Sequence, residues 1–205
     1  MSKANKSNKA IKYRLYPNDE QKVMFAKTFG CCRFVYNQLL ALQKQRYKDG
    51  ESHLSKLKSN EFATRTLKKD YDFLKEIDKF AVSNAVFHLA DAYDRFFKKQ
   101  NHFPKFKSKR KSKKSYTTNF TNNNILIGKN VIKLPKVGMV KAVIHKLPKD
   151  DWKLKSVTVS QDSVGNYFAS VLFEYEQEDI PSVSKSSTNA IGLDYKSDGL
   201  YMDSN

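Results

Sequence analysis

Alternation of apolar and polar positions predicts a short strand near the start of the chain, over residues 10–16. Asn18 follows, and with the glutamine three residues further on it completes the pattern of a helix N-terminal capping box. We therefore expect a helix over about 19–29. Gly30 interrupts the pattern, and apolar residues then resume at helical spacings, which predicts a second helix over about 31–48. Together the two would form a helical hairpin.

The periodicity remains helical well beyond this hairpin. The polar segment 54–78 favours one or two short helices, and residues 80–97 place their large apolar side chains on one stripe at helical spacing. A basic segment with a helix-breaking proline follows at 98–114. Six short alternating runs, separated by turns rich in Asn, Gly or Pro, then occupy residues 116–175 and favour a compact barrel or sandwich.

The last part of the chain changes composition again. Residues 176–188 contain acids, Pro and Ser with little to bury, which is typical of a linker. Residues 189–205 then show a strand, a turn and the start of another strand. Because two strands cannot bury a face by themselves, we expect an incomplete further domain to begin here. The whole pattern predicts an α+β protein.

The charge distribution indicates the class of partner. The chain has 38 Lys and Arg against 21 Asp and Glu, and residues 1–173 alone hold 36 basic and 14 acidic side chains, a surplus of 22. Nine of the basic residues, and no acid, lie between residues 98 and 114. They are Lys98, Lys99, Lys105, Lys107, Lys109, Arg110, Lys111, Lys113 and Lys114. A surplus of this size attracts phosphates, because each contact releases a condensed counterion.

The basic segment therefore predicts contact with nucleic acid. Phe103 and Phe106 within it, and Tyr116 just after it, are available to stack on bases or sugars. The alternative interpretation is a solvated basic loop of the kind found on ribosome-associated proteins.

Several other functions are disfavoured. No apolar run approaches the ~20 residues of a spanning helix, and the basic N-terminus lacks the apolar segment of a secretory signal, so we expect no membrane contact. Cys31 and Cys32 are adjacent, which suits neither an ordinary disulfide nor a zinc pair and favours a reducing cytoplasm. The four histidines lack metal-ligand spacing, and the sequence has no P-loop or dinucleotide-binding glycine motif.

One apolar run ends in a carboxylate, in the sequence Ile191-Gly192-Leu193-Asp194. Nucleases of the ribonuclease H type open with such a strand, whose aspartate binds divalent metal ions. An aspartate that caps a turn is an equally good interpretation of these four residues taken alone.

Seven blocks of the sequence, taken in order, resemble the TnpB family. They are AIKYRLYPNDEQ, FGCCRFVYNQLL, AYDRFFKK, HFPKFKSKRKSKKSYTTN, NVIKLPKVGMVKAVIHKLP, LKSVTVSQ and IGLDY. TnpB proteins are transposon-associated, RNA-guided DNA endonucleases, also known as OrfB-type transposases. The resemblance runs from about Lys9 to the last residue, and the order and spacing of the blocks make it specific.

The resemblance implies a fold. In the family a small β-barrel, the wedge domain, is split by a helical recognition domain and is followed by a RuvC-like nuclease domain of the ribonuclease H fold. The implied boundaries here are 1–16 for a basic tail and the first wedge strand, 17–99 for the helical recognition domain, 100–115 for a basic arm, 116–175 for the remaining wedge strands, 176–188 for a linker and 189–205 for the incomplete start of the RuvC-like domain.

The resemblance also implies a mechanism, in which a guide RNA pairs with one strand of a double-stranded DNA target while protein side chains read a short motif beside it. It places six side chains at this target-adjacent duplex: Lys79, Ser83, Asn84, Tyr116, Thr117 and Thr118. Asp194 would be the first of three RuvC carboxylates that bind two divalent metal ions, with Mg²⁺ as the usual occupant.

The sequence departs from the family in two ways. Relatives commonly read G-I-D-x-G where this chain has GLDYK, and the chain ends at Asn205, before the second catalytic Glu, the C-x-x-C zinc site and the last catalytic Asp. One carboxylate cannot position two metal ions, so we expect that this polypeptide alone does not cut DNA. Two alternatives are a nuclease-inactive DNA- or RNA-binding protein, such as a repressor-like or decayed transposon product, and a basic structural RNA-associated protein with a chance IGLD motif.

Overall fold

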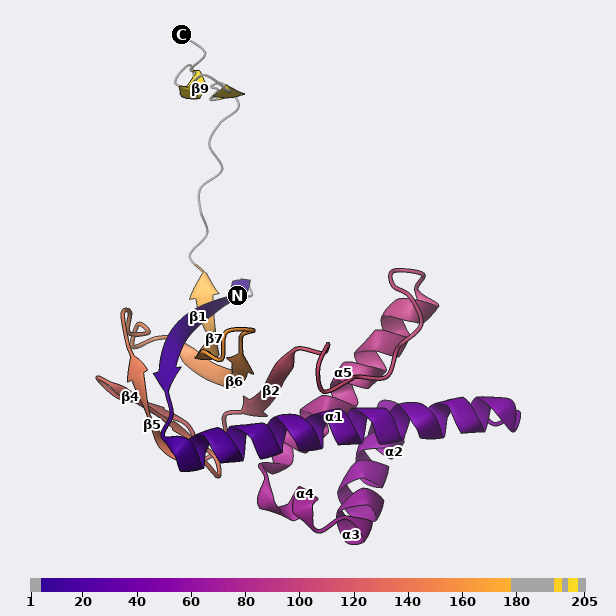
Figure 1. Ribbon diagram of the computed structural model, residues 1–205. Helices are drawn as coiled ribbons and strands as arrows, with labels where there is room; N and C mark the ends of the chain where they lie inside the picture. Colours follow the sequence, from indigo (N-terminus) through magenta and orange to yellow (C-terminus); the bar gives the residue numbers. More distant parts are fainter. Residues whose placement is uncertain (1–4, 178–193, 197–198, 203–205) are drawn as a thin grey trace. The chain divides into compact units, whose positions relative to one another are not determined.

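The structure, a computed structural model, describes residues 5–177, 194–196 and 199–202. The chain divides into two units, of which the larger comprises residues 6–175 and the smaller includes the last two strands. Each is described on its own. Within the larger unit a sheet lies beside a group of helices (Figure 1).

The larger unit contains a seven-stranded sheet with the strand order β2-β6-β7-β1-β5-β4-β3. Its strands are β1 (Asn5–Tyr16), β2 (Lys114–Asn119), β3 (Leu126–Ile127), β4 (Val131–Leu134), β5 (Gly138–Val143), β6 (Lys153–Gln161) and β7 (Tyr167–Gln177). β1 lies inside the sheet, between β7 and β5, although the helices separate it from β2 in sequence. The predicted α+β class, with helices inserted between the first strand and six later ones, is confirmed.

The strand pairs are antiparallel. Register places β1–β5, β2–β6, β3–β4, β4–β5 and β6–β7 in this arrangement. Side-chain contacts show that β1 and β7 are also antiparallel: Lys6 forms an ion pair with Glu174 of β7 at 3.5 Å, and Arg14 donates a hydrogen bond to Asn166, the residue just before β7. Residues later in β1 therefore meet residues earlier in β7.

The sheet is open, which corrects the expectation of a closed barrel. Its edges are β2 and β3, and closure would require these two strands to pair. β3 has two residues, both opposite β4, so it offers almost no ladder to a further partner. β2 instead contacts α5 (Lys79–Phe97) and α1 (Asp19–Lys48).

The start of α1 is the one predicted from the capping box. The Asn18 side chain accepts a hydrogen bond from the Gln21 N–H at 2.9 Å, and the Gln21 side chain accepts one from the Asn18 N–H at 3.1 Å. These reciprocal bonds satisfy two of the donors that a helix start leaves unpaired. The prediction of a helix beginning at Asp19 is confirmed.

The predicted helical hairpin is wrong, because α1 is one continuous helix of 30 residues. Gly30 adopts the helix and costs it about 1 kcal/mol relative to alanine. The flanking Phe29 and Cys31 are buried, and burial of large apolar side chains contributes more than this cost. Gly30 therefore lowers the stability of α1 locally but does not end the helix.

The other helices form between α1 and the basic segment. They are α2 (Lys56–Glu61), a π-helical turn η1 (Phe62–Leu67), α3 (Lys68–Asp70), α4 (Phe73–Glu76) and α5 (Lys79–Phe97). The apolar stripe predicted for α5 is buried at Val82, Val86, Leu89 and Tyr93. In the part of the chain that the structure describes, no helix has both the length and the apolar character needed to cross a bilayer.

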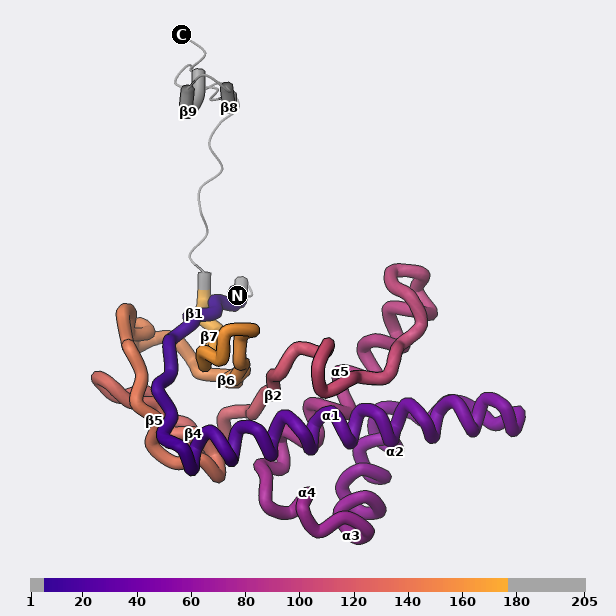
Figure 2. Tube along the Cα trace, in the orientation of Figure 1, coloured from indigo at the N-terminus to yellow at the C-terminus, as the bar shows by residue number. Residues whose placement is uncertain are grey.

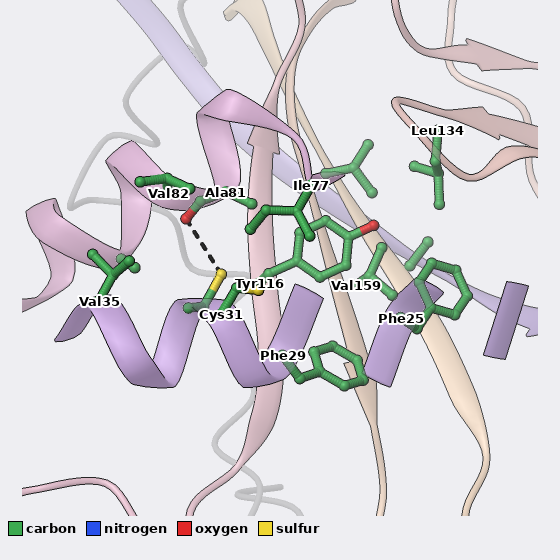
Figure 3. Packing of buried hydrophobic residues seen from close by; sticks show 14 of the residues in the cluster. Phe25, Phe29, Cys31, Val35, Ile77, Ala81, Val82, Tyr116, Leu134 and Val159 are labelled. Carbon is green, nitrogen blue, oxygen red and sulfur yellow. Dashed lines mark hydrogen bonds between the residues drawn. The ribbon is translucent and has the colours of Figure 1, made fainter. Parts of the chain in front are cut away.

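The core lies between α1, α5 and the sheet. The rings of Phe25 and Phe29 on α1 lie 6.3 Å and 5.9 Å from the ring of Tyr116 on β2, measured between centroids (Figure 3). Tyr116 is only 3% exposed, so it joins the helices to the sheet. Its packing holds β2 against α1 and α5 and so fixes the C-terminal end of the basic segment.

Both cysteines belong to this core as free, buried thiols, and the prediction that they form no disulfide is confirmed. The Cys32 thiol donates a hydrogen bond to the Ala81 carbonyl at 3.4 Å. Burial raises the pKa of the Cys31 thiol to about 11, so it remains protonated and unreactive at neutral pH.

The smaller unit contains β8 (Asp194–Lys196) and β9 (Gly199–Met202), which pair antiparallel with Asp194 opposite Met202. Two strands on either side of the predicted turn are thus confirmed, whereas a RuvC-like fold stays a prediction. Most of the predicted linker 176–188 lies outside the described residues, and its first two residues extend β7.

Candidate nucleic-acid interface

The basic segment 98–114, called the arm below, is anchored to α1. It returns from the end of α5 toward β2 (Figure 2). Asn37 of α1 fixes its middle, because the side-chain amide donates to the Lys107 carbonyl at 2.9 Å and accepts from the Lys107 N–H at 2.8 Å. Pro104 is buried, and the Phe103 ring packs edge-on against Tyr93 with centroids 5.6 Å apart. The arm is therefore a positioned segment.

Lys107 directs its ammonium group back toward the helices. The Nζ atom lies 4.0 Å from the centre of the Tyr36 ring, whose quadrupole attracts a cation. Desolvation lowers the pKa of Lys107, and no acid pairs with it within residues 5–177. A partly desolvated cation without a counterion is well prepared to bind an anion.

A small pocket, the arm pocket, lies where the arm, α1, α5 and β2 meet, and its volume is about 50 Å³. Its polar lining consists of Arg33, His88, Lys107, Ser108, Ser112, Lys113, Lys114, Ser115 and Thr117. No Asp or Glu is among the lining residues. Basic side chains and hydroxyl groups gathered without an acid are the chemistry that binds phosphate oxygens.

His88 gives the arm pocket a titratable group near neutral pH. Desolvation and then the charge of Lys107 lower the pKa of His88, while Asp91 opposes them. The imidazole is therefore neutral at pH 7 and charges only under more acidic conditions. An anion seated in the pocket would raise this pKa, because an opposite charge favours the protonated ring.

Local hydrogen bonds shape the tip of the arm. The Ser108 hydroxyl accepts from the Lys111 N–H at 3.0 Å, and the Ser112 hydroxyl accepts from the Ser108 N–H at 2.9 Å. This turn leaves the side chains of Lys109, Arg110 and Lys111 exposed. Lys98, Lys99, Lys105, Lys113 and Lys114 are exposed as well. Across the described ranges, none of the nine basic residues of the arm forms an ion pair.

Polar residues of α5 and β2 form a second arrangement, called the seam below: Asp78, Asn84, Thr117, Thr118 and Asn119. The Asn84 amide donates to the Thr117 carbonyl at 2.9 Å and to the Asn119 side chain at 3.2 Å. Asp78 accepts from the Thr118 hydroxyl at 2.6 Å and from the Ala81 N–H at 3.3 Å, which caps α5. The seam joins the helix to the sheet.

Two of the predicted site residues are buried in this region. Tyr116 and Thr118 are 3% and 0% exposed, so neither the ring nor the hydroxyl lies at a surface that a base could reach. Alternation along β2 turns both inward, because residues two apart share one face of a strand. Thr117, on the other face, is half-buried and shares a hydrogen bond with Thr158 at 2.8 Å.

The predicted α5 residues lie near a second basic region. Lys79 is exposed and lines a hollow of about 450 Å³ at the start of α5, called the α5 hollow below. Its polar lining includes Lys68, Lys75, Asp78, Thr121, Asn122, Asn124 and Lys136. Desolvation lowers the pKa of Lys68, Asp78 opposes this effect, and the charges of Lys136 and Lys79 lower the pKa further, so these cations lie close enough to repel one another. Ser83 is half-buried on the same helix.

Comparison with known proteins bears on this basic surface. Residues 7–52 match the family model of the OrfB/IS605 type, which is described as a helix-turn-helix domain. A protein of Streptomyces pristinaespiralis named "Putative RNA-guided DNA endonuclease" is 30% identical over 91% of this chain and 45% of its own length. The similarly named InsQ of Escherichia coli (strain K12) is 29% identical over 90% of this chain and 44% of its own length.

The chain belongs to the TnpB/OrfB-type family. It spans about half the length of the two relatives just described. A shorter relative, virulence protein VsdF of Salmonella dublin, is 32% identical over 49% of this chain and 93% of its own length. In this TnpB-type chain the residues matched to the helix-turn-helix description form β1 and the single helix α1.

Sequence reasoning found the arm of this TnpB-type chain but missed part of its pocket. Arg33, His88 and Ser115 line the pocket and were not predicted. A signal for Arg33 exists, since it lies four residues before Asn37 and so shares a helix face with the residue that holds the arm. His88 and Ser115 could not be found this way, because only the packing of α5 on β2 brings them together.

Asp194, the predicted catalytic and metal-binding residue, begins β8. Among the residues that the structure describes, no three His, Cys, Asp or Glu side chains gather as a metal site would require. The described residues therefore do not form a two-metal centre. The role of Asp194 stays a prediction from the family resemblance.

Proposed function

We propose that this TnpB-type chain binds a guide RNA and a double-stranded DNA target through the arm, the arm pocket and the α5 hollow. The observation that carries the proposal is the arm pocket, where basic and hydroxyl side chains meet without an acid. Three of the nine basic residues of the arm line the pocket, the other six continue this surface, and none of the nine forms an ion pair within the described residues. Phosphate contacts of this kind position a nucleic acid and supply affinity without reading sequence.

Reading of the target-adjacent motif belongs to residues at the start of α5 in this proposal. Asn84 uses its amide N–H groups on the seam, so its carbonyl oxygen has a fixed direction and remains available to accept from a base edge. Lys79, exposed beside the α5 hollow, suits a phosphate of the same duplex. Ser83 and Thr117 lie on the same two elements and complete the set.

The family's domains belong to the same proposal. The sheet corresponds to the wedge domain, the helices to the recognition domain, and β8 and β9 to the start of a RuvC-like domain. Asp194 would be its first metal-binding carboxylate. Because one carboxylate cannot position two metal ions, we further propose that the 205-residue polypeptide alone binds nucleic acid without cleaving it.

A binding assay tests the first part. The purified chain is titrated against an unstructured RNA and against a 20-bp DNA duplex at about 50 mM salt, with fluorescence anisotropy as the readout. We expect binding to both, weakening steeply as salt is added. Absence of binding to either nucleic acid at this salt concentration would overturn the proposal.

A cleavage assay tests the second part. The same chain is incubated with Mg²⁺, a matched guide RNA and its target, alongside the Asp194→Ala variant. We expect intact DNA in both reactions. Nicking by the unmodified chain that the variant loses would show that the 205 residues suffice for catalysis and would contradict the proposal.

A further inference from the structure

A hollow of about 590 Å³, called the aromatic hollow below, lies between the C-terminal halves of α1 and α5. It is lined by Gln43, Lys44, Tyr47, Lys48, Glu51, His53, Tyr93, Phe96, Phe97 and Phe103. Five of these ten residues are phenylalanine or tyrosine, and His53 adds an imidazole. The packing of the arm on α5 accounts for Tyr93 and Phe103, but neither the fold nor the proposed phosphate contacts account for the exposed rings of Tyr47 and Phe97.

The rings are organised around a buried base and an exposed rim. Tyr93 is buried, and it meets His53 edge-on at 4.5 Å, Phe103 edge-on at 5.6 Å and Phe97 in a stacked arrangement at 6.1 Å between centroids. At the rim, Tyr47 is 85% exposed and Phe97 is 64% exposed. Large aromatic faces left in water on a wall of fixed rings are a surface that gains by receiving another flat, apolar group.

The charges around the aromatic hollow indicate what that group is attached to. Lys44 and Lys48 line it and form no ion pair within the residues that the structure describes. The lining acid, Glu51, is already paired with Arg46. Lys44 also lies 4.7 Å from the Phe106 ring centre and so connects the hollow to the arm. The uncompensated charge at the rim is thus positive.

The other polar groups that line the hollow are already hydrogen-bonded or neutral. Gln43 is buried, with its amide donating to the Leu54 carbonyl at 3.3 Å and accepting from the Leu54 N–H at 3.1 Å. Desolvation lowers the pKa of His53, so its ring is neutral at pH 7. An incoming ring would therefore stack on this surface rather than be read by hydrogen bonds.

We propose that the aromatic hollow binds an unpaired nucleobase of a single-stranded nucleic acid segment. Tyr47 and Phe97 stack on the base, while Lys44 and Lys48 meet the adjoining phosphates. Every base has a flat π-face, so the site tolerates any sequence but rejects a strand without bases. A paired base is inaccessible inside a duplex, which restricts the site to single strands. The inference rests on the proposed nucleic-acid binding and adds to it a contact that is not electrostatic.

The experiment compares two strands of equal charge. One is an oligouridylate of about twelve residues, and the other is a fully abasic strand of the same length, so that both carry the same phosphates. Binding of each to the complete 205-residue chain is measured by competition at fixed salt. We expect the base-bearing strand to bind about tenfold more tightly, as stacking on one base supplies.

The double variant Tyr47→Ala with Phe97→Ala should bind both strands with the affinity that the unmodified chain has for the abasic strand. Variants that retain a ring, Tyr47→Phe with Phe97→Tyr, should keep the preference. As a matched control, Leu57→Ala with Val164→Ala removes two apolar side chains that are 81% and 83% exposed elsewhere, and it should leave the preference unchanged.

The outcomes separate this inference from the proposal beneath it. If the unmodified chain binds the two strands equally, or if the alanine variant keeps the preference, the hollow does not bind a nucleobase and the phosphate contacts still stand. If the unmodified chain binds neither strand, the proposed nucleic-acid binding itself is wrong. The inference would also be wrong if the alanine variant bound the abasic strand more weakly than the unmodified chain does, because the two rings would then contribute something other than stacking on a base.

Discussion

The arm and the seam use their polar and charged side chains in opposite ways. The seam places Asn, Thr and Asp where each bonds another part of the chain, as when Asp78 accepts from Thr118 at 2.6 Å. The arm holds its backbone through Asn37 and leaves its basic side chains without an acidic partner in the described ranges. A polar side chain therefore contributes to stability in the seam and is available for a ligand in the arm. Substitutions in the seam should therefore lower stability, whereas substitutions in the arm should lower the affinity for nucleic acid.

The largest loss of stability should come from Asp78→Ala in the seam. The change removes the N-cap of α5 and leaves the buried Thr118 hydroxyl without an acceptor. Together these effects should lower the free energy of unfolding by about 2–4 kcal/mol. Urea denaturation measures the change, and Asp78→Asn, which retains an acceptor oxygen, serves as the control with a smaller loss. A decrease below about 0.5 kcal/mol would mean that Asp78 does not hold the seam.

Asn84→Ala should have a smaller effect in the same region. It removes two hydrogen bonds, to the Thr117 carbonyl and the Asn119 side chain, and should cost about 1–2 kcal/mol of stability. Ser83→Ala, at a neighbouring half-buried position, should cost less than about 0.5 kcal/mol. Equal losses from the two variants would argue against a distinct role for Asn84 in joining α5 to β2.

Gly30→Ala should stabilise the protein, by about 0.5–1 kcal/mol. A Cβ at Gly30 has no atom within 4 Å, and the residue lies inside α1, where alanine is the better helix former. Gly50→Ala is the matched contrast, because Gly50 has a φ of +72° and a side chain there is strained. The melting temperature should rise for Gly30→Ala and fall for Gly50→Ala. Destabilisation by Gly30→Ala would contradict a continuous α1.

The smallest predicted effect is on pH dependence and concerns the histidines. Desolvation lowers the pKa of both His53 and His88 in the folded state. The unfolded chain therefore binds more protons just below pH 6.5, and stability should fall as the pH drops through this range. The melting temperature should be lower at pH 5.5 than at pH 7.5, and the double variant His53→Asn with His88→Asn should show a smaller difference. A melting temperature that rises on acidification would contradict the lowered pKa values of these histidines in the folded protein.

Local sequence signals predicted much of the fold. The capping box at Asn18 located the start of α1, and the apolar stripe from Val82 to Phe97 located α5, although the Phe97 ring at its end is exposed. Alternation located the strands of the sheet, and every one of them except the two-residue β3 has buried side chains on one face. Gly30 misled the prediction, since the local cost of a glycine is smaller than the gain from burying its neighbours.

Only the part of the candidate site that a run of basic residues forms could be predicted from the sequence. The acid-free run 98–114 identified the arm without any structure. Tyr116 was predicted at the surface because aromatic residues near basic ones suit nucleic acids, but the strand period turns its ring into the core. The arm pocket brings Arg33 together with residues more than fifty positions away, and no local pattern encodes such an arrangement.

The most direct test of the arm as a phosphate-binding surface is the salt dependence of affinity. Binding to a 20-bp DNA duplex is measured between about 50 and 300 mM salt for the unmodified chain and for the triple variant Lys109→Ala, Arg110→Ala, Lys111→Ala. A second triple variant, Lys146→Ala, Lys149→Ala, Lys153→Ala, removes the same charge from exposed positions near β5 and β6.

If the arm contacts phosphates, the arm variant should bind more weakly, and the slope of log affinity against log salt should fall by roughly 3, near 0.9 for each lost contact. The second variant should keep a slope close to that of the unmodified chain. An unchanged slope in the arm variant, or an equal decrease in both variants, would contradict the account.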